Sequence, residues 1–216
     1  SNFSIITGGP GTGKTTTVAK ILALLYKQKP DLKVALAAPT GKAAARLSES
    51  LRTAVEINPQ LNDISEKLEQ IVPKTIHRLL QSLPQSSLFR HNSKNPLEHD
   101  LVIIDEASMI DGALMYKLMD SIRPQNRIIF LGDKNQLASV EAGSIFGDLC
   151  RTQGDLMNHL DKNRLDFCNK YIDHKIPVKL ILDPEKRHVL SHHIIQLHRN
   201  SRADSKHISQ ACRLIM

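Results

Sequence analysis

A glycine-rich stretch near the start of the sequence has the residue types and spacing of a phosphate-binding loop. "ITGGPGTGKTTT" places Gly8, Gly13, Lys14 and Thr15 in the pattern Gly-x-x-x-x-Gly-Lys-Thr, after an apolar run and before a helical pattern. Glycines let successive backbone N–H groups turn inward around phosphate oxygens, and the start of a helix adds positive potential there. A lysine can reach the β- and γ-phosphates, and a threonine hydroxyl can coordinate Mg²⁺.

We therefore expect ATP and Mg²⁺ as cofactors. The alternative is a glycine-rich turn that binds nothing, which the complete strand–loop–helix context disfavours. The expected nucleotide contacts are Gly8, Gly9, Pro10, Gly11, Thr12, Gly13, Lys14, Thr15 and Thr16.

Two acidic residues follow a second apolar run, in "LVIIDEASMID". Asp105 ends the predicted strand, where its carboxylate can share the Mg²⁺ with Thr15, usually through water. Glu106 is placed to accept a proton from an attacking water. An isolated Asp-Glu pair would more often be two exposed acids, but the buried run before it and the phosphate loop upstream favour the site. A kinase would not need Glu106, whereas a hydrolase does.

A glutamine follows a third apolar run, in "IIFLGDKNQLASVEAG". The strand before Gln136 is expected to neighbour the strand that ends at Asp105. An amide can donate to a phosphate oxygen and accept from a water proton, so it can register whether the γ-phosphate is present. The neighbouring loop could then move when the phosphate leaves. We interpret Gln136 as a γ-phosphate sensor.

The elements that must position these residues read as an α/β fold. Near-continuous apolar runs indicate strands buried on both faces, as in parallel sheets. Helical patterns alternate with the runs, and ligands of such sheets bind at the carboxyl ends of the strands. The sequence predicts a P-loop NTPase with a mostly parallel sheet flanked by helices. The predicted strands are Phe3–Thr7, Val34–Ala38, Leu101–Asp105 and Ile128–Gly132.

Composition is compatible with one large domain, or with one domain and part of a second. The chain has 216 residues, of which 41% are hydrophobic, and a net charge of +7 that is compatible with a polyanionic partner. Three cysteines without C-x-x-C spacing indicate free thiols and a cytoplasmic location. No apolar run reaches 18 residues, so no transmembrane helix and no membrane partner are expected.

Three segments interrupt or extend this pattern. Residues 82–99 are rich in Ser, Pro and Asn and are expected to form an insertion, with a small hairpin as one interpretation. Further along, Val178–Leu182 and Ile194–His198 have strand-like composition, and Ile208–Ile215 has that of a terminal helix.

These motifs together resemble the superfamily 1 helicases, and within them the RecD family, the α subunits of exodeoxyribonuclease V (RecBCD). The resemblance covers most of residues 4–150. The segments that carry it are "GGPGTGKTTT", "APTGKAAARL", "TIHRLL", "NPLEHDLVIIDEASMID" and "FLGDKNQLASVEAGSIFGDLC". It implies a motor of two RecA-like lobes with ATP between them, moving 5′-to-3′ on single-stranded DNA beside RecB-like and RecC-like subunits in double-strand break processing. The sequence shows no nuclease signature, and the resemblance implies that the nuclease resides on another subunit of that complex.

The resemblance also implies a division of the chain. Residues 1–150 would be the first RecA-like lobe, including the insertion at 82–99. Residues 151–199 would be its variable continuation, and 200–216 the start of a second lobe. A chain with so little of the second lobe is expected to bind nucleotide better than it hydrolyses it. "LHRNSRAD" resembles a degraded motif IV, in which Arg202 would contact the γ-phosphate.

By the same resemblance, two segments would line the DNA track of the first lobe. The expected contacts are Thr40, Gly41, Lys42, Thr75 and His77. Hydroxyls and amides at helix starts can grip backbone phosphates without reading sequence. Ordinary helix capping is an equally good interpretation of the two threonines, and Lys42 could be a solvated surface charge.

Two alternatives to a RecBCD-type motor stay open. The first is a free-standing RecD-like helicase or the helicase part of a conjugative relaxase, although the insertion "RHNSKNPLEHD" favours the RecBCD-type subunit. The second is a non-catalytic docking module that responds to nucleotide.

Overall fold

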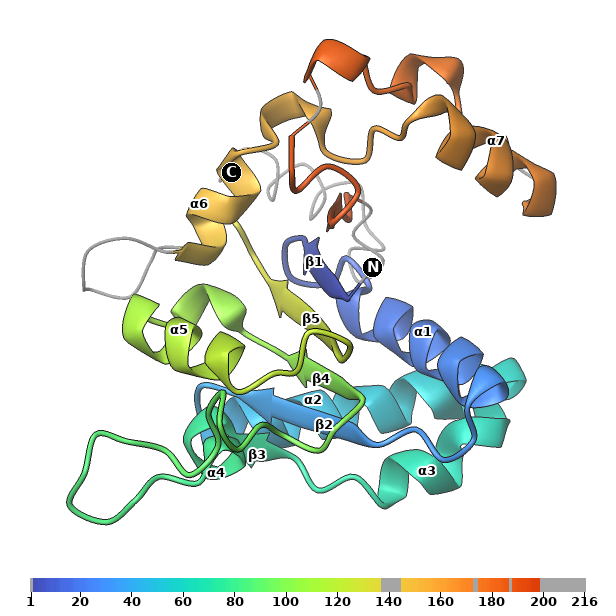
Figure 1. Ribbon diagram of the computed structural model, residues 1–216. Helices are drawn as coiled ribbons and strands as arrows, with labels where there is room; N and C mark the ends of the chain where they lie inside the picture. Colours follow the sequence, from blue (N-terminus) through green and yellow to red (C-terminus); the bar gives the residue numbers. More distant parts are fainter. Residues whose placement is uncertain (1, 137–144, 173–174, 187, 199–216) are drawn as a thin grey trace.

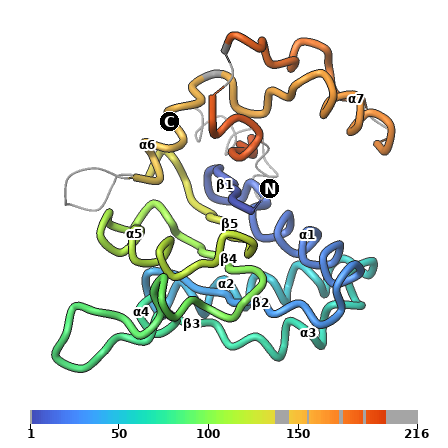
Figure 2. Tube along the Cα trace, in the orientation of Figure 1, coloured from blue at the N-terminus to red at the C-terminus, as the bar shows by residue number. Residues whose placement is uncertain are grey.

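The computed structural model describes residues 2–136, 145–172, 175–186 and 188–198. Its centre is a six-stranded sheet in the order β3-β2-β4-β5-β1-β6, and the paired strands run parallel (Figures 1 and 2). The predicted fold class is confirmed.

The elements have the following bounds. The strands are β1 Phe3–Thr7, β2 Val34–Ala38, β3 Lys74–Thr75, β4 Leu101–Ile104, β5 Arg127–Gly132 and β6 Ile194–Gln196. The α-helices are α1 Lys14–Gln28, α2 Gly41–Glu56, α3 Ser65–Glu69, α4 Ile76–Leu80, α5 Gly112–Asp120, α6 Ile145–Arg151 and α7 Lys162–Tyr171. The 3₁₀ turns are η1 Pro59–Ile64, η2 Ala107–Met109, η3 Gly154–Leu156, η4 Val178–Leu180 and η5 Pro184–Lys186.

The sheet is buried on both faces because neighbouring residues of one strand serve opposite helical layers. Ile5 faces the core formed with α4, α5 and α6, whereas Ile6 faces the core formed with α1 and α2. Phe130 and Leu131 of β5 divide in the same way. This alternation explains why the strands appear in the sequence as unbroken apolar runs.

The position of β5 decides which motifs meet. β5 lies between β1 and β4, with Phe130 opposite both Ile5 and Ile104. The carboxyl ends of these strands therefore share one edge of the sheet. The phosphate loop after β1, the acidic pair after β4 and Gln136 after β5 all begin at that edge.

The insertion at 82–99 forms a short antiparallel excursion beside α4 (Figure 1). Ser82 bridges Phe89, and Asn92 bridges Asn95. The Phe89 ring packs 5.7 Å from the His77 ring and partly against the core, with the Lys117 ammonium 5.3 Å from its centroid. The hairpin interpretation agrees with these bridges.

The segment after α6 differs in part from expectation. Val178–Leu182 is not a strand: residues 178–180 form η4, and Ile181 makes an isolated bridge to Leu160. Pro177 begins this turn, and the Ile181 N–H bonds back to the Val178 carbonyl, which closes a 3₁₀ turn in place of a ladder. The expected strand at Ile194–His198 is present as β6, which pairs with β1. The predicted helix Ile208–Ile215 lies outside the described residues.

Candidate active site

The phosphate loop connects β1 to α1, and its glycines have the backbone conformations that such a loop requires. Gly11 and Gly13 have φ of 78° and 86°, in the left-handed region that side chains with a Cβ rarely adopt. A Cβ on Gly8 would lie 2.6 Å from Thr12 Oγ1 and 2.9 Å from the Leu197 carbonyl oxygen. Gly8 is therefore enclosed by the Thr12 side chain and by Leu197, and a larger residue there would displace the loop.

The donors in this loop suit an anion. Within the part of the chain that the structure describes, no side-chain hydrogen bond caps the first turn of α1, so its N–H groups suit an anion. The Lys14 ammonium donates to the Gly8 carbonyl at 2.6 Å and the Gly9 carbonyl at 3.2 Å, which places its charge over the loop. Thr15 and Thr16 follow in the first turn, half-buried. The residues present fit a nucleotide triphosphate with Mg²⁺.

The acidic pair begins where β4 ends. Asp105 is held by its backbone N–H, which donates to the Ala37 carbonyl of β2 at 2.9 Å. Burial raises the pKa of Asp105, and the positive charges of Lys14 and Arg46 act in the opposite direction. A half-buried carboxylate near cations is a suitable oxygen ligand for Mg²⁺.

Glu106 has an unusual backbone conformation. Its φ of 52° and ψ of 40° lie in the left-handed region, which costs a residue with a side chain about 1 kcal/mol. The turn starts η2 immediately after β4. Strained residues of this kind persist where the surrounding structure imposes them, and they cluster at functional sites.

Gln136 is positioned by a residue that the sequence analysis missed. The Ser108 hydroxyl, 3% exposed, donates to Gln136 Oε1 at 2.8 Å. The Gln136 backbone N–H also bonds to the Asp133 carbonyl. With its Oε1 held by Ser108, the amide NH₂ group is left to donate elsewhere. Ser108 lies three residues after Asp105, and no sequence pattern distinguishes it from other small polar residues.

A cavity of about 450 Å³ joins expected hydrolysis residues to expected DNA contacts. Glu106 and Gln136 line it, and so do Thr40 and Lys42. Arg46, one helical turn beyond Lys42, also lines it and was not singled out from the sequence. The remaining lining residues are Ala43 and Met109.

Two of the expected DNA contacts, Thr40 and Thr75, cap helices. The Thr40 hydroxyl accepts from the Ala43 N–H, and the Thr75 hydroxyl accepts from the Arg78 N–H, both at 3.2 Å. Each threonine is thus the N-cap of α2 or α4. A hydroxyl that accepts from the backbone keeps its own proton to donate, so capping and phosphate contact are compatible.

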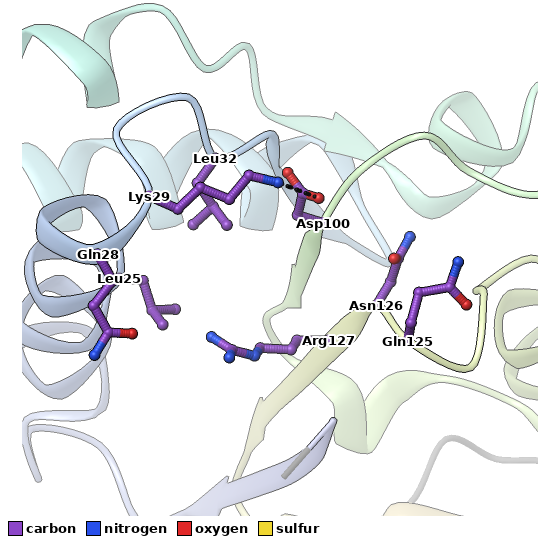
Figure 3. Close-up of a pocket in the computed structure, with 8 residues that line it drawn as sticks. All are labelled: Leu25, Gln28, Lys29, Leu32, Asp100, Gln125, Asn126 and Arg127. Atoms are coloured by element: carbon purple, nitrogen blue, oxygen red, sulfur yellow. Dashed lines mark hydrogen bonds and ion pairs between the residues drawn. The ribbon is translucent and has the colours of Figure 1, made fainter.

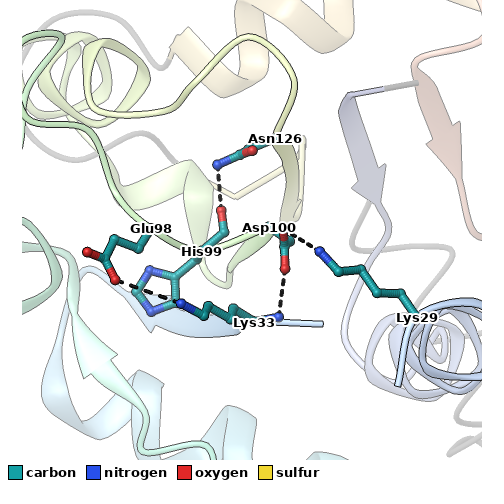
Figure 4. Close-up of polar contacts among 6 residues, drawn as sticks. All are labelled: Lys29, Lys33, Glu98, His99, Asp100 and Asn126. Carbon is teal, nitrogen blue, oxygen red and sulfur yellow. Dashed lines mark hydrogen bonds and ion pairs between the residues drawn. The ribbon is translucent and has the colours of Figure 1, made fainter. Parts of the chain in front are cut away.

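A second cavity, of about 240 Å³, lies at the opposite edge of the sheet (Figure 3). Its residues lie around the end of α1 and the starts of β4 and β5. Asp100 accepts from Lys29 Nζ and from the Lys33 N–H, each at 2.9 Å (Figure 4). These hydrogen bonds lower the pKa of Asp100. The contacts fasten α1 and the start of β2 to the start of β4, away from the phosphate loop.

Two further observations concern expected contacts. Arg202 lies outside the described residues. Among those residues, no helix is both long and apolar enough to cross a membrane.

Comparison with known proteins gives the family. The AAA domain family matches residues 1–142. The chain belongs to this family. The predicted resemblance to RecD is confirmed as well. RecBCD enzyme subunit RecD of Mycolicibacterium smegmatis is 48% identical over 159 residues, covering 70% of this chain and 28% of that protein. RecBCD enzyme subunit RecD of Haemophilus influenzae is 46% identical over 155 residues, covering 70% and 24%.

A protein that is not named as a RecBCD subunit also matches the chain. The ATP-dependent RecD2 DNA helicase of Deinococcus radiodurans is 42% identical over 140 residues, covering 64% of this chain and 16% of that protein. The chain thus spans less than a third of the length of these relatives.

Proposed function

We propose that the chain is the ATP-binding and hydrolysing lobe of a DNA helicase that translocates 5′-to-3′ on single-stranded DNA. The observation that carries the proposal is the meeting of Lys14, the Asp105–Glu106 pair and Gln136 at one edge of a parallel sheet. The similarity to RecD relatives supports a role in double-strand break processing and recombinational repair.

In the proposed reaction the phosphate loop, Gly8 to Thr16, holds the triphosphate. Thr15 and Asp105 would hold Mg²⁺, which would supply positive charge to offset the negative charge that develops in the reaction. Glu106 takes a proton from the attacking water. Gln136, held by Ser108, orients that water or the γ-phosphate. Arg202 would complete the charge around the γ-phosphate.

The proposed DNA track runs along the starts of α2 and α4. Thr40, Gly41 and Lys42 would hold one backbone phosphate, and Thr75 with His77 another. Contacts to phosphates are independent of sequence, which suits a translocating motor. His77 is already fixed against Phe89, so its ring is oriented by the insertion.

We place the protein in the cytoplasm as a subunit beside RecB-like and RecC-like partners, with no membrane contact. Residues 1–150 would form the first RecA-like lobe. Residues 151–199 would be its continuation, consistent with β6 extending the sheet beside β1. Residues 200–216 would begin the second lobe.

A free-standing helicase is the second candidate, favoured by the RecD2 relative. Copurification of the natural full-length protein separates the two. RecB-like and RecC-like subunits in stoichiometric amounts support the subunit, and a lone active helicase supports the alternative.

The experiment for the motor itself is ATP turnover by the natural full-length protein, with its partners where they copurify, with and without single-stranded DNA. Removing the base with Glu106→Gln is expected to lower turnover by about 10²–10⁴-fold, because general-base catalysis is worth that much. Mg·ATP binding should persist, since the phosphate loop is intact. Glu66→Gln, the same change at an exposed position of α3, should behave as wild type.

If Mg·ATP binds tightly but ATP turnover is absent or does not respond to DNA, the proposal of a motor is wrong. The proposal of a nucleotide-gated docking module would then take its place. Partner binding that survives Glu106→Gln would agree with such a module.

A further inference from the structure

Helix α2 links the expected DNA contact to the ATPase residues through a rigid body. Its apolar face is buried against α1 and η1, with Leu47 and Leu51 each 1% exposed. Its N-terminal turn carries Thr40 and Lys42, and Arg46 lies one turn further along the opposite, exposed face. Four residues of an α-helix span about 6 Å along its axis. The core thus fixes the distance from the DNA-contacting turn to the backbone of Arg46.

Arg46 lies near the acidic pair. It lines the same cavity as Glu106 and Gln136, and it lies near enough to Asp105 for its charge to act on that carboxylate. Nothing among the described residues forms a hydrogen bond or a direct ion pair with its guanidinium. An arginine side chain carries about 2 kcal/mol of rotamer entropy, so a fixed partner is needed to hold its charge in one place.

We propose that Arg46 is a positioning residue that couples DNA bound at the first turn of α2 to the orientation of Glu106. The proposal rests on the proposed function and adds to it a route by which DNA accelerates hydrolysis. A DNA phosphate beside Lys42, four residues from Arg46 on the same face, gives the guanidinium a fixed partner at the cavity. Ordered there, Arg46 presents a fixed positive charge to Glu106, which lines the same cavity.

This arrangement changes the orientation of the Glu106 carboxylate. A general base acts only when its oxygen lies within hydrogen-bond reach of the water proton. Glu106 is held by its backbone turn, but among the described residues no hydrogen bond or ion pair fixes its carboxylate. A fixed cation in the same cavity supplies that restraint only when DNA is present. The coupling thus acts on turnover number and leaves the phosphate loop, and so ATP affinity, unchanged.

The experiment measures kcat and KM for ATP, with and without saturating single-stranded DNA, in the natural full-length protein and its Arg46→Gln variant. We expect the variant to lose about tenfold or more of the DNA stimulation of kcat, within the usual range of coupling between sites. The quantity compared is the ratio of kcat with DNA to kcat without DNA in each variant, because loss of the Arg46 charge near Asp105 also acts on basal turnover. Arg46→Lys keeps the charge and should recover part of the stimulation.

Arg52→Gln is the matched control, because it makes the same change on the exposed face of α2 beyond the cavity. It should retain full stimulation. Affinity for a labelled oligonucleotide, measured by anisotropy, separates the possible outcomes. Undiminished stimulation in Arg46→Gln overturns the proposal. A variant that loses stimulation only because it no longer binds DNA also overturns it, since Arg46 would then be a plain DNA contact.

A different result would show that the proposed function itself is wrong. In that case the wild-type protein would show no increase of kcat on addition of single-stranded DNA. If Arg46→Gln is poorly folded, Arg46→Lys decides: loss of all stimulation at unchanged melting temperature contradicts an electrostatic role that lysine can share.

Discussion

At the scale of single residues, the pair formed by Ser108 and Gln136 shows how an amide becomes a directed donor. An amide side chain can present its oxygen or its nitrogen to a neighbour, and nothing in its chemistry selects between the two. The buried Ser108 hydroxyl bonds to Oε1 at 2.8 Å, so the NH₂ group of Gln136 is the part that remains available. A phosphate oxygen, which only accepts, is matched to that orientation.

We predict that Ser108→Ala lowers kcat for ATP in the full-length protein by about two- to tenfold, because one hydrogen bond contributes about 0.5–1.5 kcal/mol. KM should change little, since Ser108 does not touch the phosphate loop. Steady-state ATPase assays test this, with Ser87→Ala in the exposed insertion as control. A variant with wild-type kcat would show that Gln136 needs no such restraint.

At the scale of elements, the end of β5 depends on contact with α6. Gly132 has no side chain, and a Cβ there would lie 2.8 Å from the Phe146 ring, which is itself fully buried. The Gly132 carbonyl also accepts from the Gly8 N–H at 3.2 Å. One glycine therefore lets α6 approach the sheet and at the same time anchors the start of the phosphate loop.

We predict that Gly132→Ala destabilises the protein by about 1–3 kcal/mol, the usual cost of overpacking a core. It should also weaken nucleotide binding, because a displaced Gly132 carbonyl no longer holds Gly8. Thermal unfolding and titration with a fluorescent ATP analogue measure the two effects. Gly41→Ala is the control for stability: a Cβ at that helical position meets nothing within 4 Å. Equal melting temperatures for the two variants would contradict the packing argument.

At the scale of the whole molecule, the segment after α6 returns to the sheet. Asn158 holds β6 through a reciprocal pair of 2.9 Å hydrogen bonds with the Gln196 backbone. β6 pairs with β1 as the next strand of the sheet, and Leu197 lies beside Gly8 of the phosphate loop. The region with the weakest sequence pattern therefore supports the strand that carries the phosphate loop.

The reactivity of the Cys150 thiol depends on whether this part of the protein is folded. Cys150 is fully buried at the end of α6, and burial raises the pKa of its thiol to about 11. The neutral thiol favours the folded state below the usual cysteine pKa, and this contribution is lost as the pH rises towards the folded value. At pH 8 we expect Cys150 to react with a maleimide only on unfolding, whereas the half-buried Cys168 reacts in the native protein. Peptide mapping after timed labelling distinguishes the two, and rapid labelling of Cys150 would contradict its burial.

Much of the fold and part of the candidate site could be predicted from local pattern. Unbroken apolar runs such as Leu101–Ile104 mark strands buried on both faces, and the spacing from Gly8 to Thr15 marks the loop between strand and helix. The insertion and β6 were also found, but η4 was mistaken for a strand. Composition records how apolar a segment is and does not record whether a partner strand lies beside it.

The sequence by itself determined the element order, the phosphate loop and the acidic pair, because each depends on residues close together in the chain. Only the tertiary structure decided what those residues meet. It inserted β5 between β1 and β4, joined Ser108 to Gln136, and brought Arg46 to the cavity shared with Glu106. Such contacts arise when distant segments pack around a common core, and no local spacing encodes which side chains then share a cavity.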